Sequence, residues 1–113
     1  MAPAFVAVAK LEEIPLAGVK VATSGGVDLL VCRTETGEVF AVENLCTHEF
    51  SPLGAGRLVG CQIECPRHGA RFDLRTGEAT RLPAASPIRT FPVKVQGGQV
   101  WVAVGSSVPP GSA

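Results

Sequence analysis

Both histidines of the 113-residue chain follow a cysteine closely, in two short segments. Cys46-Thr47-His48 is a C-x-H segment, Cys65-Pro66-Arg67-His68 is a C-x2-H segment, and sixteen residues separate the two. Each segment offers one thiolate and one imidazole from a tight loop. Two thiolates and two imidazoles suit a tetrahedral zinc ion, or a [2Fe–2S] cluster in which one iron has two Cys and the other two His. The pattern predicts a metal centre on Cys46, His48, Cys65 and His68.

The distribution of the ligand types over the two segments favours the iron–sulfur cluster. Zinc fingers usually pair like with like, C-x2-4-C followed by H-x3-5-H, which places both thiolates on one loop. Here each segment contributes one cysteine and one histidine. Each loop can then span the long axis of a two-iron cluster. A structural zinc module is the alternative.

Two further cysteines, Cys32 and Cys61, raise the possibility of two disulfides, as in a small secreted protein. Residues 1–10 lack a basic region followed by an apolar stretch, so we expect no signal peptide. A chain of this length can build a core without disulfides, and cysteines clustered with histidines in a reducing compartment are more often metal ligands. We therefore expect Cys32 to be a small buried hydrophobic residue and Cys61 to be structural, on the strand that enters the second loop.

The composition indicates a globular chain of one domain. Hydrophobic residues make up 46% and charged residues 18% of the sequence. Ten basic and ten acidic residues cancel, so nothing in the charge balance favours nucleic acid or an anionic membrane as partner. No run approaches the roughly 18 apolar residues of a membrane span. We expect a cytoplasmic protein without a membrane segment.

Short β-branched runs alternate with Gly-rich turns, which indicates an all-β protein. Ser24-Gly25-Gly26 and Gly97-Gly98 both read as turns, the second as a hairpin signal. A single helical turn is expected at residues 11–14. The expected strands are residues 5–9, 19–23, 27–33, 38–42, 60–65, 70–74, 88–95 and 99–104.

The middle of the chain differs from both flanks, because it holds both histidines, three of the four cysteines and five arginines. We expect a β-sandwich-like base made from residues 1–42 and 84–105. A small cluster-binding sub-domain, residues 43–83, is inserted between them. Residues 106–113 are small residues and proline, and we expect a disordered tail there.

At these positions the chain resembles the Rieske family, whose signature is C-x-H, fifteen to seventeen residues, then C-x2-H. The resemblance covers nearly all of the chain and includes Asn44, Gly69 and the segment Phe72-Asp73-x-x-Thr76-Gly77. It implies a Rieske-like β-sandwich base with an inserted cluster sub-domain. It also implies a [2Fe–2S] cofactor with Cys46 and Cys65 on one iron and His48 and His68 on the other.

The surrounding residues suggest where the reduction potential lies within the Rieske range. Histidine ligands leave the cluster less negative than four cysteines do, which corresponds to roughly −150 to +300 mV against about −400 mV. Rieske proteins of cytochrome bc complexes raise the potential further with a loop disulfide and with serine and tyrosine hydroxyls that donate to sulfur. This chain has Ala70 and Phe72 in place of the serine and tyrosine, Arg67 in place of one loop cysteine, and no tyrosine at all. We expect a low potential.

The chain resembles most the small Rieske-type ferredoxins of bacterial ring-hydroxylating dioxygenase systems, which take part in aromatic hydrocarbon catabolism. This implies an electron carrier, not an enzyme. It would take single electrons from an NAD(P)H-dependent flavin reductase and deliver them to a terminal oxygenase. The alternative is a small Rieske-like subunit of a larger oxidoreductase such as assimilatory nitrite reductase. We expect a monomer, since a carrier has to meet two partners in turn.

Overall fold

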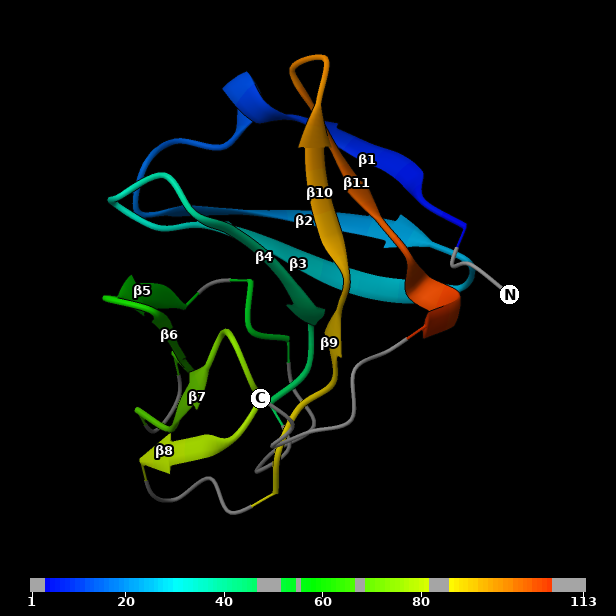
Figure 1. The fold of residues 1–113 in the computed structure, drawn as a ribbon. Coiled ribbons are helices and arrows are strands. Elements are labelled where there is room, and N and C mark those ends of the chain that lie inside the picture. The colour runs from blue at the N-terminus through cyan, green and yellow to red at the C-terminus, as the bar shows by residue number, and fades with distance from the viewer. Residues whose placement is uncertain (1–3, 47–51, 55, 67–68, 82–85, 107–113) are drawn as a thin grey trace.

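The computed structural model describes residues 4–46, 52–54, 56–66, 69–81 and 86–106 (Figure 1). Within these ranges the chain forms antiparallel β-strands in three sheets, together with two single 3-10 turns. The all-β prediction is confirmed. In this part of the chain, no helix is long and apolar enough to cross a membrane.

The first sheet joins the two ends of the chain. Its order is β1-β11-β10, with β1 at Val6–Lys10, β11 at Gln99–Val102 and β10 at Val93–Gln96. Gly97 and Gly98 connect β10 to β11 with φ of 63° and 73°. Both angles favour glycine, which explains the hairpin signal in the sequence. The expected helical turn is η1, Leu11–Glu13.

The second sheet is the central layer. Its order is β2-β3-β4-β9, with β2 at Gly18–Ser24, β3 at Val27–Arg33, β4 at Val39–Glu43 and β9 at Thr90–Phe91. Leu29 and Val31 of β3 belong to the buried cluster shared with the first sheet. Leu30 and Cys32 belong to a second buried cluster on the opposite face. Because both faces of β3 are covered, its sequence is a continuous apolar run rather than an alternating one.

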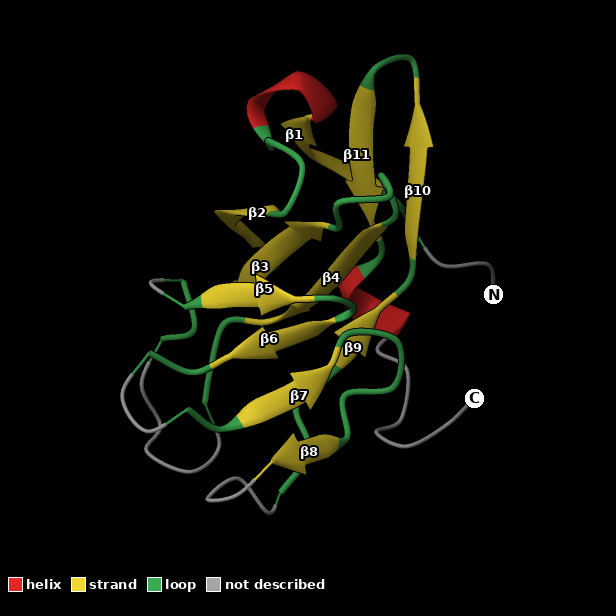
Figure 2. Cartoon of the chain, turned by 90° about the vertical axis from the view of Figure 1, so that its left-hand side faces the viewer, coloured by secondary structure: helices red, strands yellow, loops and turns green. Residues whose placement is uncertain are grey.

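The third sheet is built from the middle of the chain alone and lies beside the central layer (Figure 2). Its order is β5-β6-β7-β8, with β5 at Arg57–Val59, β6 at Gln62–Glu64, β7 at Arg71–Asp73 and β8 at Ala79–Arg81. Ile63 and Phe72 are paired across β6 and β7 and are fully buried in the same cluster as Leu30 and Cys32. This cluster joins the third sheet to the second.

Several expected element boundaries were wrong. The sequence did not indicate β5 and β8, which are only three residues long and carry arginines. The strand expected at 88–95 is divided at Pro92, which has no N–H to donate, and its two parts join different sheets. The last strand ends at Val102, and η2 follows at Val104–Ser106. Of the expected disordered tail, residues 107–113 lie outside the described part of the chain.

Candidate metal centre

Cys46 follows β4 by three residues, and the chain between them is fixed by backbone hydrogen bonds. The Glu43 N–H donates to the Arg89 carbonyl at 2.9 Å, and the Asn44 N–H donates to the Asp28 carbonyl at 3.0 Å. The Cys46 side chain is completely buried. The first loop of the predicted centre therefore starts from an anchored strand end.

Asn44 closes that loop from the other side. Its side-chain oxygen Oδ1 accepts a hydrogen bond from the Leu53 backbone N–H at 2.8 Å. The side chain thus ties the residue two before Cys46 to the far end of the loop, across residues 47–51, which the structure does not describe. From the sequence, Asn44 was named only as part of the family resemblance, with no role for its side chain. The signal that could have revealed one is the frequent pairing of Asn side chains with nearby backbone groups in turns.

Cys65 directly follows β6, and a tight turn begins at this residue. The Cys65 N–H donates to the Ala70 carbonyl at 2.7 Å, and the Gly69 N–H donates back to the Cys65 carbonyl at 3.2 Å. Gly69 has a φ of 74°, a left-handed conformation that costs little only for glycine. The two hydrogen bonds fix both ends of the second loop, and only 2% of Cys65 is exposed.

The fold brings Cys46 and Cys65 into one buried cluster, together with Leu53, Ala70 and Leu74. None of the four cysteines, all of which lie in the described ranges, forms a disulfide. His48 and His68 lie outside the described residues, as does Arg67, so the structure describes two of the four predicted ligands. Two buried sulfurs at the starts of two loops fit the cysteine half of a [2Fe–2S] cluster, because a buried thiolate needs a compensating cation.

Cys32 and Cys61 are placed differently from this pair. Cys32 lies near the end of β3 and is completely buried, as predicted, and burial raises the pKa of its thiol. Cys61 lies in the turn between β5 and β6, not on the expected strand, and is partly exposed. Partial burial is the main reason why its thiol pKa is also raised. Neither thiol is activated as a nucleophile.

Alkylation should distinguish these two thiols in the cluster-loaded protein. We expect iodoacetamide to modify Cys61 within the native fold and to modify Cys32 only after unfolding, because Cys32 is inaccessible. Peptide mass spectrometry over time would measure both rates. A Cys61→Ser variant should lose the early adduct. Modification of Cys32 at the rate of Cys61 would contradict the packing described here.

Glu64, next to Cys65 in the chain, is paired with several arginines. Arg71 donates to it from Nε at 2.9 Å, and Arg57 donates from Nε at 3.3 Å. The hydrogen bond from Arg71 is the main cause of a lowered pKa at Glu64. The carboxylate is therefore ionised at neutral pH, and a fixed charge lies beside the second loop.

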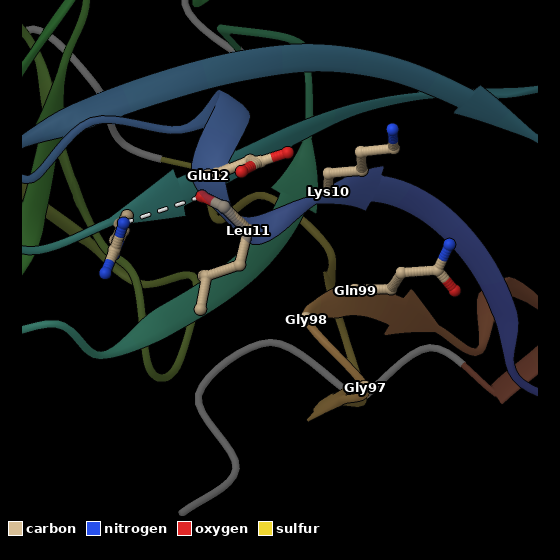
Figure 3. A pocket seen from close by; sticks show the side chains of 7 residues that line it. Lys10, Leu11, Glu12, Gly97, Gly98 and Gln99 are labelled. Atoms are coloured by element: carbon tan, nitrogen blue, oxygen red, sulfur yellow. Dashed lines mark hydrogen bonds between the residues drawn. The ribbon is translucent and has the colours of Figure 1, made fainter.

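A cavity of about 510 Å³ lies at the other end of the molecule, between the end of β1 and the β10–β11 turn (Figure 3). Lys10, Glu12 and Gln99 line it, and the Arg33 guanidinium donates to the Leu11 carbonyl at 3.5 Å along its wall. Its lining includes no thiol or imidazole. This cavity contributes nothing to the metal centre.

Comparison with known families identifies the class of protein. Residues 4–92 match the family described as the Rieske [2Fe-2S] domain. The chain belongs to this family, and its cofactor is a [2Fe–2S] cluster. The prediction of an iron–sulfur cluster is confirmed over the zinc alternative.

Among Rieske proteins, the chain is similar to ferredoxins of aromatic dioxygenase systems. The ferredoxin component of the naphthalene 1,2-dioxygenase system of Pseudomonas aeruginosa is 42% identical over 92 residues, 81% of this chain and 88% of the relative. The ferredoxin of carbazole 1,9a-dioxygenase from Nocardioides aromaticivorans IC177 superposes with a TM-score of 0.82 at 36% identity, covering 88% of this chain and 96% of that one. A chain in the complex of reduced oxygenase and oxidized ferredoxin in carbazole 1,9a-dioxygenase gives 0.81 at 31% identity, covering 90% and 94%.

One similar structure bears on the alternative function. A putative nitrite reductase NADPH small subunit superposes with a TM-score of 0.78, covering 88% of this chain and 97% of that one. The two sequences are only 16% identical. At that identity the likeness concerns the fold alone.

Proposed function

We propose that this protein is the ferredoxin component of a bacterial ring-hydroxylating dioxygenase system. It carries single electrons from an NAD(P)H-dependent flavin reductase to a terminal oxygenase and performs no catalysis of its own. The observation that carries the proposal is a match to a dioxygenase ferredoxin component over 81% of this chain and 88% of that relative. A fold with two buried cysteines at the starts of two anchored loops supports it.

The cluster ligands are, in this proposal, Cys46 and Cys65 on one iron and His48 and His68 on the other. The burial of both cysteines in one hydrophobic cluster supports the first half of this assignment. The histidines come two residues after Cys46 and three after Cys65, which places them further along the same loops. They would then form the outer side of the centre, where a partner can approach.

When bound, the cluster accepts and releases one electron at a time. The described residues do three things for it. Cys46 and Cys65 keep the sulfur ligands away from water, since their exposed fractions are 0% and 2%. Two hydrogen bonds fix the positions of the two loops: the Leu53 N–H donates to the Asn44 side chain, and the Cys65 N–H donates to the Ala70 carbonyl. Ala70 and Phe72, both fully buried, offer no side-chain hydroxyl to a sulfur, which favours a potential low in the Rieske range.

We also propose that the chain consists of a base and an inserted sub-domain. The base is formed by residues 1–42 and 84–105, and the cluster-binding sub-domain by residues 43–83. The separate β5–β8 sheet, which takes all its strands from that middle segment, supports this division. The protein acts as a monomer in the cytoplasm, where thiols stay reduced until the cluster is assembled.

Reconstituted electron transfer tests this function. The purified protein should be coloured, should bleach on dithionite reduction and should then show an EPR signal. With NADH, a flavin-dependent ferredoxin reductase and the naphthalene 1,2-dioxygenase oxygenase component, naphthalene hydroxylation should depend on added protein. The same mixture without it is the control. Electron delivery to a sirohaem nitrite reductase, and to no ring-hydroxylating oxygenase, would favour the alternative function instead.

A further inference from the structure

Four charged side chains form a row across the third sheet. Arg57 is paired with Glu64 between β5 and β6, Glu64 with Arg71 between β6 and β7, and Arg71 with Arg81 between β7 and β8. Directly opposed residues of neighbouring strands point to the same face of a sheet. The adjacent positions Ile63 and Phe72 point into the core, so this row faces outward. We call these four residues the arginine row.

The arginine row has one carboxylate for three guanidinium groups. Glu64 Oε2 lies 2.8 Å from Arg71 Nη2 and 4.0 Å from Arg81 Nη1, and Oε1 lies 3.3 Å from Arg57 Nε. The four side chains therefore carry a net charge of about +2 at neutral pH. A single carboxylate accepts one bidentate guanidinium well, so the outer arginines keep donors available.

Exposure divides the row into an inner pair and two outer arms. The side chains of Glu64 and Arg71 are only 17% and 23% exposed, whereas those of Arg57 and Arg81 are 73% and 57% exposed. The ion pair between Glu64 and Arg71 holds the two inner charges in place. The side chains of the two outer arginines reach solvent on either side of this pair. Of the acidic residues on the same sheet, Asp73 lies two positions along β7, and its carboxylate accepts the Arg75 backbone N–H at 2.8 Å.

The arginine row lies next to the two loops of the metal centre. Glu64 immediately precedes Cys65, and β5 begins where the first loop returns to the sheet, so the row borders the loops of the metal centre. Figure 2 shows the four strands side by side at this end of the molecule. The whole chain has ten basic and ten acidic residues, so the charged residues outside the row sum to about −2.

We propose that the arginine row is the docking surface for a group of carboxylates on the terminal oxygenase. The inference rests on the function proposed above. Guanidinium forks match carboxylates in geometry, and opposite charges around a small contact speed up the encounter of two proteins. The oxygenase is chosen as the occupant because a similar ferredoxin chain occurs in a complex with its oxygenase. Docking here brings the partner to the edge of the cluster loops.

Charge-removing variants test the proposal. The variants are Arg57→Gln, Arg81→Gln and the double variant, with Lys94→Gln as the control. Lys94 is exposed on β10 of the first sheet, where it lies over the Phe5 ring at 4.8 Å, and its replacement removes one positive charge, as each single variant does. Stopped-flow absorbance would follow electron transfer from the dithionite-reduced holoprotein to the naphthalene 1,2-dioxygenase oxygenase component.

We expect each single variant to lower the second-order rate constant about 3-fold at low ionic strength, and the double variant about 10-fold. The rate of the double variant should also depend less on salt. Lys94→Gln should stay within about twofold of wild type, because its charge lies outside the contact. The visible spectrum and the reduction potential should be unchanged in all four variants, which separates docking from damage to the cluster.

Two results would overturn the proposal. One is a double variant as fast as Lys94→Gln; the other is a double variant slowed only in its reduction by the flavin reductase, since the row would then serve the other partner. Suppose that the reduced wild-type protein reduces ferricyanide but no ring-hydroxylating oxygenase. This result would contradict both the proposed function and the oxygenase as docking partner. The docking proposal alone fails when wild type reduces the oxygenase and the variants do so equally well.

Discussion

Replacing Cys46 with alanine is expected to abolish the visible absorption and the reduced-state EPR signal of the [2Fe–2S] cluster, whereas Cys32→Ala leaves both in place. The two thiols are alike in their burial and in the hydrophobic cluster to which they belong. Both are completely buried and both belong to the same hydrophobic cluster. They differ in position, because Cys32 lies inside β3 and Cys46 lies at the start of the first loop.

The comparison separates loss of a ligand from loss of packing. Each substitution removes one buried sulfur atom and should cost about 1 to 2 kcal/mol in packing. In the proposed ligand set, only Cys46→Ala also loses a bond to iron, and with it the contribution of the cluster to folding. Iron content per chain, the visible spectrum and the apparent melting temperature would be measured for both variants. Two irons per chain in Cys46→Ala, or a colourless Cys32→Ala protein, would refute the ligand assignment.

Much of the fold could be predicted because turn residues and apolar runs mark the longer strands. Gly97-Gly98 and Gly25-Gly26 form the two turns that the sequence predicted, and all four glycines have positive φ values. The edge strands β5 and β8 could not be predicted, because pairing with β6 and β7 defines them and no longer strand-like segment surrounds them. The strands β6 and β7 are equally short, but they lie within the longer segments 60–65 and 70–74 that indicated strands. The sequence also left open that a third layer covers the second face of β3. Burial on both faces is a property of the assembled sheets rather than of the segment.

In the metal centre, too, some features could be predicted from residues close together in the sequence, whereas others depend on how the chain folds. The spacing of Cys46 and Cys65 relative to the two histidines is local and was enough to predict an iron–sulfur cluster, a cofactor that the family match confirms. The hydrogen bond between the Asn44 side chain and the Leu53 N–H depends on the path of the first loop, because the two residues are nine positions apart. The arginine row depends on strand register, since Arg57 and Arg81 come together only through β6 and β7. Pairing across strands is not visible in the order of residues alone.

Gly77→Ala is expected to destabilise the protein by about 2 to 4 kcal/mol, the largest effect we expect from a residue outside the metal centre. Gly77 is buried in the connection between β7 and β8, with a φ of 80°. Its carbonyl accepts the Ile88 N–H at 2.9 Å, which ties the third sheet to the segment leading into β9. A Cβ at this position would overlap the Ile88 carbonyl oxygen. The backbone would have to move apart at the contact between the two sheets.

Gly60→Ala is the matched control for this prediction. Gly60 has a similar φ of 60°, but a Cβ there would meet nothing within 4 Å. Its substitution should cost only the left-handed backbone conformation, about 1 to 2 kcal/mol. Apparent melting temperatures of the cluster-loaded proteins measure the difference, at roughly 4 to 8 °C per kcal/mol for a domain of this size. Equal shifts in the two variants would mean that the carbonyl contact of Gly77 contributes nothing. A larger shift in Gly77→Ala, together with earlier loss of cluster colour on heating, would show that the junction between the sheets supports the two loops of the proposed metal centre.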